Sequence, residues 1–303
     1  MKSLMDVLPE VGLALGAGRA VVALESTLVA HGLPWPDNLE TAQAMAAAVR
    51  ESGAVPAIVA LAKGRIQVGL SDAQLEALAR GQGAARKVSR RDLAAVLQAG
   101  GGGATTVAAT MAIAHSAGIA VFATGGIGGV HRGAAESFDV SADLPELART
   151  PVAVIASGAK SILDLPKTLE VLETQGVPVV GYGTDDFPAF YSRTSGLKLE
   201  ARVECPRAAA ALIATQRTLD LGGLLIANPI PQSDALPAEA LEAMTAQAQK
   251  DAEAAGIVGK DLTPLLLKRL FELSDGQTLA ANKALLVANA RLGGQIAAAL
   301  ATL

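Results

Sequence analysis

Residues 93–130, LAAVLQAGGGGATTVAATMAIAHSAGIAVFATGGIGGV, contain no aspartate, glutamate, lysine or arginine. The length of this stretch alone would allow it to cross a membrane. It is interrupted, however, by the glycine run 100–103, by His115 and by a second glycine cluster at 125–129. Inside a bilayer these breaks would leave backbone hydrogen-bonding groups without partners. The stretch therefore predicts the buried interior of an α/β fold and no membrane segment.

The composition of the whole chain agrees with a large, dry core. Of the 303 residues, 51% are hydrophobic, 18% are charged and only 3% are aromatic. Abundant glycine and small aliphatic residues suit helices packed closely on a parallel sheet. The net charge of −4 and the few aromatic residues provide neither a basic surface nor a stacking platform for a nucleic-acid polymer. We therefore expect a small-molecule ligand.

The cysteine content and the first residues indicate where the protein works. Cys205 is the only cysteine, so no disulfide can form within the chain, which favours a reducing compartment and a cytoplasmic location. Asp6, Pro9 and Glu10 interrupt any apolar segment that could act as a signal peptide.

Apolar segments of strand length alternate with segments of helical period along the chain. We predict strands at 21–26, 55–62, 119–124, 151–157, 178–184 and 223–229. We predict helices at 37–53, 71–80, 104–117, 161–175, 207–220, 237–255, 263–274 and from 278 almost to 303, where glycines 293–294 could form a break. Asp37 or Asn38 would cap the first helix, and Ser71 with Gln74 has the form of a capping box.

No linker or internal repeat divides this pattern. Residues 1–303 are therefore predicted to form a single large α/β domain with a central, mainly parallel sheet and helices on both faces. The apolar excess and the long C-terminal helix also favour an oligomer.

Two charged residues follow predicted strands, at the edge where parallel sheets bind ligands. Glu25 closes the first strand; its carboxylate either caps the next turn or, if buried, acts as a general acid, because burial raises the pKa of a carboxyl group. Lys160 follows an apolar strand and has glycine and alanine as neighbours. It is either an exposed surface lysine or an amine with room to attack a sugar carbonyl.

The first glycine run could lead to an anion site. Residues 100–103 precede Thr105, Thr106 and Val107, at the predicted start of a helix. Backbone N–H groups and the helix dipole favour a phosphate there, although tight packing also explains such glycines. Lys87, in a charged segment that otherwise reads as a solvated turn, would contribute only if it faced this anion.

The second glycine cluster leads into a polar segment. Its spacing differs from the Gly-x-Gly-x-x-Gly pattern, which disfavours a dinucleotide site. The segment that follows contains the polar residues His131, Arg132, Glu136, Asp139, Ser141 and Asp143. They form either a solvated loop with salt bridges or a site for a hard cation bound by carboxylate oxygen and water.

Taken in order, several motifs closely resemble the pseudouridine-5′-phosphate glycosidase family, also called indigoidine synthase A-like. They occupy residues 23–34, 87–93, 105–110, 124–133, 139–144, 157–164 and 228–231, and Gly259-Lys260 and Ala281-Asn282 fit the last third of the family pattern. The resemblance extends from about residue 10 to the C-terminus, with no departure at the chemically important positions.

The resemblance implies a homotrimeric enzyme that interconverts pseudouridine 5′-phosphate and water with ribose 5-phosphate and uracil. It implies that Lys160 is the nucleophile, which forms a Schiff base with the ring-opened sugar, and that Glu25 donates and accepts the proton. It also implies that Asp139 anchors one divalent metal ion per subunit, typically Mn²⁺, largely through water. The implied substrate-binding residues are Lys87, Thr106, Val107, His131, Ser141, Ala142, Asp143 and Asn282.

The residue types suit this chemistry. Pseudouridine joins its sugar to a carbon of uracil, which leaves less readily than a nitrogen, so the reaction needs both an electron sink and an acid. An imine on a lysine supplies the first, and a protonated carboxyl group supplies the second. Two alternatives remain open from the sequence. One is a Schiff-base aldolase acting on another sugar phosphate, and the other is a phosphate- or nucleotide-binding protein without catalysis.

Overall fold

The computed structural model describes residues 1–82, 86–257 and 262–303, so Gly259 and Lys260 of the last motif lie outside the described residues. Within this part of the chain one sheet of eleven strands has the order β1-β4-β3-β2-β7-β8-β11-β9-β10, and β6 pairs with β3 and with β5. The strands are β1 (Met5–Val7), β2 (Val21–Leu24), β3 (Val55–Ala62), β4 (Arg65–Val68), β5 (Arg86–Val88), β6 (Gly103–Thr105), β7 (Val121–Ala123), β8 (Ala153–Ala156), β9 (Val179–Tyr182), β10 (Ala201–Val203) and β11 (Leu224–Ala227).

The central part of the sheet is parallel. Every neighbouring pair from β3 through β2, β7, β8, β11 and β9 to β10 runs in the same direction. Only β4 and β6 pair with β3 in the antiparallel sense. The predicted mainly parallel sheet is therefore confirmed, and all six predicted strands are present. These strands have three to eight residues, and all but β9 are almost entirely buried, as expected for strands covered on both faces.

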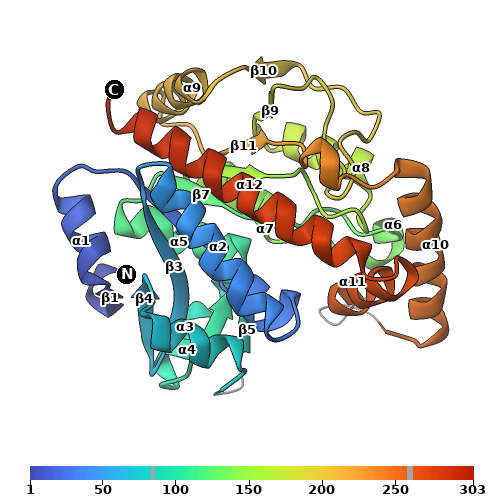
Figure 1. Cartoon of the computed structure of the whole chain (residues 1–303), viewed down its shortest axis with the longest axis horizontal. Helices are drawn as coiled ribbons and strands as arrows, with labels where there is room; N and C mark the ends of the chain where they lie inside the picture. Colours follow the sequence, from blue (N-terminus) through green and yellow to red (C-terminus); the bar gives the residue numbers. More distant parts are fainter. Residues whose placement is uncertain (83–85, 258–261) are drawn as a thin grey trace.

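The helices follow the alternating order that the sequence predicts (Figure 1). They are α1 (Pro9–Gly16), α2 (Asp37–Glu51), α3 (Asp72–Ala79), α4 (Leu93–Gln98), α5 (Val107–Ala117), α6 (Ala134–Ser137), α7 (Asp143–Arg149), α8 (Leu165–Thr174), α9 (Pro206–Thr218), α10 (Ala238–Ala254), α11 (Leu262–Leu273) and α12 (Gln277–Leu300). Short 3-10 or π turns occupy Lys2–Leu4, Leu28–Gly32, Arg90–Asp92 and Gln232–Asp234. No described helix is long and apolar enough to span a bilayer.

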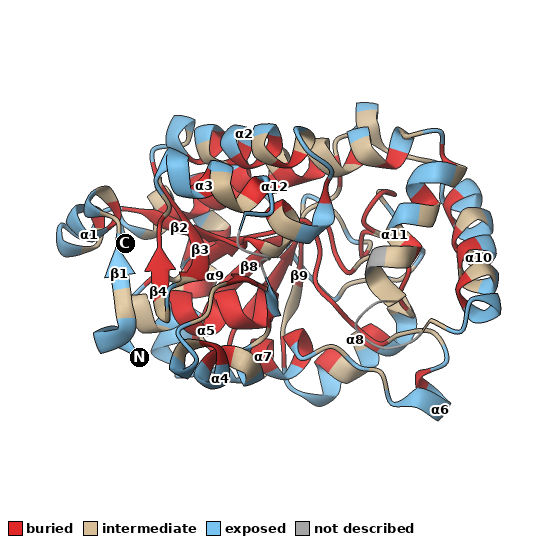
Figure 2. Cartoon of the chain, turned by 90° about the horizontal axis from the view of Figure 1, so that it is seen from below, coloured by how far each residue is buried: buried red, intermediate tan, exposed pale blue. Residues whose placement is uncertain are grey.

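Helices cover both faces of the sheet, as predicted. Figure 2 shows α2 and α12 on one face and α5 and α7 on the other, with the buried strands between them. Helix α12 lies along α2 and crosses β2, β7 and β8, the centre of the parallel sheet. Helices α10 and α11 pack on each other beyond one end of the sheet (Figure 1).

Two predictions about helix starts are corrected by the structure. The helix expected from residue 104 begins at Val107, because residues 103–105 form β6 and pair with β3 and β5. A Cβ atom at Gly103 would lie 2.4 Å from Val88 Cγ2, so packing against β5 accounts for this glycine. Asp37 and Asn38 lie inside α2 and do not cap it; the buried Asn38 amide instead donates to the carbonyls of Val29 and Ala79. The Ser71–Gln74 capping box is confirmed.

The break considered at glycines 293–294 is also absent, since α12 continues without interruption to Leu300. These glycines instead allow α12 to approach its neighbours closely. A Cβ at Gly294 would lie 2.6 Å from Ser52 Cβ, at the end of α2, and one at Gly293 would lie 3.1 Å from Ala123 Cβ in β7. The glycine pair therefore fixes how closely the C-terminal helix covers the sheet.

We predict that Gly294→Ala lowers the free energy of unfolding by about 1–3 kcal/mol, because the added methyl group overpacks the contact between α12 and α2. Urea denaturation of the two proteins measures this difference. Gly16→Ala, at the end of α1, is the control, since a Cβ there meets nothing within 4 Å. An equal effect of the two substitutions would contradict the prediction.

Candidate active site

Six ionisable side chains lie close enough to one another to interact through their charges. They are Glu25, Lys87, His131, Asp139, Asp143 and Lys160, and we refer to them as the polar cluster. They come from the end of β2, from β5, from the segments that follow β7 and β8, and from the start of α7. Positions far apart in the sequence thus meet at one edge of the sheet, as expected for the carboxyl ends of parallel strands.

Glu25 is the buried acid of the cluster. It directly follows β2 and is only 8% exposed, and the hydroxyl of Thr124, directly after the neighbouring strand β7, donates a hydrogen bond to its carboxylate. Burial raises the pKa of Glu25, and the negative charge of Asp143 acts in the same direction. Lys160, the Thr124 hydrogen bond and Lys87 oppose this rise. Of the two alternatives for Glu25, its burial and raised pKa favour the general acid, because they favour the protonated form that a proton donor requires.

Lys160 lies in a turn after β8 and is half-buried. Its backbone N–H donates to the carbonyl of Ile127 at 3.1 Å, and the Ile127 N–H donates to the carbonyl of Gly158 at 3.1 Å. Gly158 has a positive φ of 74°, and a Cβ there would lie 2.1 Å from the carbonyl oxygen of Pro188. The turn therefore needs glycine at this position. It places the Lys160 charge beside those of Glu25, Lys87 and His131.

Asp143 links two backbone segments of the site. One carboxylate oxygen accepts the Ala108 N–H at 2.9 Å, and the other accepts the Gly128 N–H at 2.8 Å. A Cβ at Gly128 would lie 2.3 Å from Ser141 Oγ and 2.9 Å from Asp143 Oδ2, so the second glycine cluster admits this approach. The Asp143 side chain is thus bonded to the backbone, and it fixes the start of α5 relative to the 125–129 loop.

The start of α5 has fewer backbone N–H groups available to bind an anion than the sequence indicates. Thr106 is the N-cap, and its hydroxyl accepts the Ala109 N–H at 3.4 Å, while the Ala108 N–H is bonded to Asp143. Among the described residues the Val107 N–H has no hydrogen-bond partner. Lys87 lies in the strand beside this entry, paired in register with Ala104 of β6. Val107 and Lys87 are therefore the groups here that can face an anion.

Two cationic groups of the cluster have lowered pKa values. Partial burial of the ammonium group and the positive charge of Lys160 lower the pKa of Lys87, although the residue keeps exposed surface; Asp143, Glu25 and Asp139 oppose the change. Burial lowers the pKa of His131, with Lys160 and Lys87 adding to the effect and Asp139 opposing it. Burial is the main cause of both shifts and neighbouring positive charge adds to it; a bound anion would oppose both.

The polar segment after the second glycine cluster folds back on itself. Val130 pairs with Val140, the His131 N–H donates to the Asp139 carbonyl at 3.0 Å, and the Ser141 N–H donates to the Gly129 carbonyl at 3.0 Å. Asp139 and Ser141 are thereby held opposite His131, and the exposed Ala142 caps the start of α7.

For the hard-cation site considered in this segment, the described residues provide Asp139 as the available carboxylate ligand. The described residues contain no group of three or more histidine, cysteine or acidic side chains that could hold a metal ion. Asp139 is half-buried, and its carboxylate accepts no hydrogen bond from the described part of the chain, whereas that of Asp143 is bonded twice. A metal here would have one protein ligand and several waters, as Mg²⁺-like ions commonly do.

Asn282 is half-buried on α12, one turn before Leu285 and Leu286. Both leucines lie 3.2 Å from the position of a Cβ at Gly125, which follows Thr124. Asn282 therefore lies on the side of α12 that faces the strand ends. No hydrogen bond joins it to the polar cluster among the described residues, so its role in binding stays a prediction.

Two features of the site were not identified from the sequence. Thr124 lies within a recognised motif, but its bond to Glu25 requires that β2 and β7 be neighbours. Glu146, whose side chain is fully buried, pairs with Arg90 at 2.5 Å and with Arg149. This ion pair joins the segment after Lys87 to α7, although Arg90 appears in the sequence as part of a solvated charge run.

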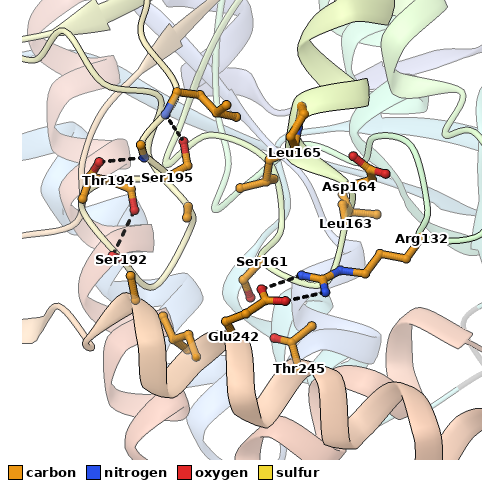
Figure 3. Close-up of a pocket in the computed structure, with 16 residues that line it drawn as sticks. Arg132, Ser161, Leu163, Asp164, Leu165, Ser192, Thr194, Ser195, Glu242 and Thr245 are labelled. Atoms are coloured by element: carbon orange, nitrogen blue, oxygen red, sulfur yellow. Dashed lines mark hydrogen bonds and ion pairs between the residues drawn. The ribbon is translucent and has the colours of Figure 1, made fainter.

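A cavity of about 630 Å³ lies beside Ser161, and no residue of the polar cluster lines it. Figure 3 shows the bidentate ion pair of Arg132 and Glu242, which joins the segment after the second glycine cluster to α10 across this space. The cavity is thus next to the loop that carries Lys160 but separate from the polar cluster.

Comparisons with known proteins identify the family of this chain. The family model described as indigoidine synthase A like protein matches residues 10–299. A protein of Sorangium cellulosum named pseudouridine-5′-phosphate glycosidase is 56% identical over 100% of this chain and 96% of its own length. One of the same name from Methylobacterium nodulans is 58% identical over 98% of this chain and 88% of its own length.

Solved structures give the same result for the fold. The crystal structure of the prealnumycin C-glycosynthase AlnA in complex with ribulose 5-phosphate has a TM-score of 0.91 and 41% identity, covering 99% of this chain and 97% of that one. An indigoidine synthase A-like protein from Thermotoga maritima has a TM-score of 0.89 and 36% identity, covering 98% and 97%.

The raised pKa of Glu25 leads to a prediction about stability. Above pH 4.5, the ordinary pKa of a glutamate side chain, Glu25 loses its proton more readily in the unfolded protein than in the folded one. The contribution of protonated Glu25 to the stability of the fold is therefore lost as the pH rises towards its folded pKa. We therefore expect Glu25→Gln to stabilise the protein relative to wild type by an amount that grows as pH increases above 4.5. Urea denaturation at pH 5 and pH 8 tests this; a difference that is constant or shrinks with pH would contradict it.

Proposed function

This chain belongs to the indigoidine synthase A-like protein family, and we propose that it is a pseudouridine-5′-phosphate glycosidase, which interconverts pseudouridine 5′-phosphate and water with ribose 5-phosphate and uracil. The observation that carries the proposal is the 56% and 58% identity with full-length relatives of that name. The buried acid Glu25 and the amine of Lys160, at one edge of the sheet, are the groups that this reaction needs.

In this mechanism the Lys160 amine attacks C1′ and the C1′–O4′ bond breaks, which opens the sugar ring and leaves C1′ bonded to both the lysine nitrogen and C5 of uracil. Glu25 protonates C5, the C1′–C5 bond breaks as uracil leaves, and the lone pair of the lysine nitrogen forms the imine. Hydrolysis of the imine then releases ribose 5-phosphate and the free lysine. The interaction between the charges of Glu25 and Lys160 supports their action on one substrate, and the raised pKa of Glu25 favours its protonated form.

The groups around this pair suit a sugar phosphate. Lys87 and the Val107 N–H, which has no hydrogen-bond partner among the described residues, are the proposed phosphate contacts, and we propose His131 and Ser141 as further substrate contacts. Thr106, Ala142 and Asp143 support these contacts through the backbone. The complex of the related AlnA with ribulose 5-phosphate agrees with a substrate of this class. Binding by its phosphate would hold the small substrate in place for reaction.

We propose that Asp139 holds one Mn²⁺ ion, mainly through water. The single available carboxylate fits an ion with a largely aqueous coordination sphere and does not fit a dry site with several protein ligands. Such an ion would supply positive charge beside the bound phosphate. We further propose that the enzyme works as a homotrimer in the cytoplasm, which the free, exposed Cys205 and the apolar excess of the chain support.

The first test is incubation with pseudouridine 5′-phosphate and Mn²⁺, followed by chromatography for uracil. We expect uracil from the wild type, and about a 10⁴-fold or greater loss of kcat in Lys160→Ala, because the variant lacks the amine that we assign to imine formation. Lys268→Ala is the control, since that side chain is 73% exposed on α11. If wild-type protein neither released uracil nor formed product from ribose 5-phosphate and uracil, the proposed function would be wrong.

A second test concerns the metal. Removing divalent ions with a chelator is expected to abolish turnover, and added Mn²⁺ to restore it. Asp139→Asn should raise the Mn²⁺ concentration needed for half-maximal activity by about 10- to 100-fold, because it removes the anchoring charge. A manganese titration of both proteins measures this, and an unchanged titration curve for Asp139→Asn would exclude Asp139 as the anchor.

A further inference from the structure

Asn289 is a fully buried polar residue in the middle of helix α12, whose other buried residues are mostly apolar. A buried amide is costly unless its polar atoms are hydrogen-bonded. The Asn289 Nδ2 atom donates to the Thr124 carbonyl at 2.8 Å and lies 3.1 Å from Ser157 Oγ. Its Oδ1 atom accepts the Asn228 side-chain N–H at 2.9 Å. Both ends of the amide are thus satisfied, by residues more than 60 positions away.

The partners of Asn289 stand in equivalent places of the fold. Thr124 directly follows β7, Ser157 directly follows β8 and Asn228 directly follows β11. These are three adjacent parallel strands. A single side chain from α12 therefore joins the carboxyl ends of three neighbouring strands at the edge where the polar cluster lies.

Two of these strand ends carry the groups that we assign to the reaction. The Thr124 hydroxyl donates to Glu25, so the main chain that Asn289 holds also positions the acid. Ser157 begins the turn that ends at Lys160, and the Ser157 N–H donates to the Gly125 carbonyl at 2.8 Å. Asn289 touches neither Glu25 nor Lys160, but both are attached to segments that it contacts.

We propose that Asn289 is a positioning residue, which fixes the Glu25 carboxyl group relative to the Lys160 amine by holding the ends of β7 and β8. This inference rests on the proposed function for the roles of Glu25 and Lys160. It adds a residue of the C-terminal helix to the parts of the molecule on which the reaction depends. A displacement of about 1 Å in such a pair can lower a rate by about 100-fold.

The test uses Asn289→Leu, which keeps the shape of the side chain but can neither donate nor accept a hydrogen bond. Asn289→Ala is made in parallel, so that a failure of one variant to fold leaves the other to decide. We expect kcat for uracil release to fall by about 10- to 100-fold, with KM for pseudouridine 5′-phosphate changed less than about threefold. The control is Thr278→Val, which removes a different buried hydrogen-bonding group of α12, the hydroxyl that bonds Ser274. This variant should keep kcat within about twofold of wild type.

A second measurement needs no turnover. The Thr124 hydrogen bond and the charges of Lys160 and Lys87 lower the pKa of Glu25, against the effects of burial and of Asp143. If the loss of the Asn289 amide loosens Thr124, the Thr124 hydrogen bond should lower the pKa of Glu25 less than it does in wild type. The difference in free energy of unfolding between Glu25→Gln and its parent protein is expected to grow with pH. This growth should be larger when the parent is an Asn289 variant than when the parent is wild type.

The outcomes separate this inference from the proposed function. If wild type releases no uracil, the proposed function fails, while the stability measurement still decides whether Asn289 acts on Glu25. If wild type is active but the Asn289 variants keep kcat within about twofold, change only KM, or lose no more activity than Thr278→Val, Asn289 is not a positioning residue. An unchanged pH dependence of stability would overturn its link to Glu25.

Discussion

The parallel alignment of β2, β7, β8 and β11 is the constraint on which the rest of this molecule depends. Each of these strands ends in an apolar residue and is followed at once by a polar one: Glu25, Thr124, Ser157 and Asn228. Because the strands run in the same direction, their polar successors meet at one edge and their apolar residues remain in the core. The loops beyond this edge then bring Lys160, His131 and Asp139 to the same place.

The sequence predicted the central sheet because β2, β3, β7, β8, β9 and β11 are apolar runs whose burial needs no knowledge of their neighbours. It did not predict β1, β4, β5, β6 or β10. Of these, β1, β5 and β10 have only three residues each and include exposed positions. The glycines were interpreted from local rules alone. Glycines 293–294 suggested a break, yet their contacts lie in α2 and β7, and only the folded structure shows that they permit close packing.

The candidate site was predicted mostly from the family resemblance and only partly from physical reasoning. A carboxylate after a buried strand is a recognisable acid, and its raised pKa follows from burial. The pairing of Glu25 with Lys160, 135 positions apart, depends on strand order, which no local pattern contains. For the same reason Thr124 and Asn289 were missed. The hydrogen bonds of Asp143 to two backbone N–H groups also depend on the folded arrangement of loops, and its role in substrate binding stays a prediction.

The place of α12 in the chain has a consequence for the order of synthesis. This helix, residues 277–300, covers β2, β7 and β8 and supplies the amide that joins three strand ends, yet the ribosome makes it after every strand of the sheet. A nascent chain that has completed β11 therefore has all the strands of the sheet, but α12 does not yet cover its side of β2, β7 and β8. Its apolar face is left to chaperones or to transient collapse until the last helix emerges. The ends of β7, β8 and β11 thus form their hydrogen bonds with Asn289 only when nearly the whole polypeptide has been made.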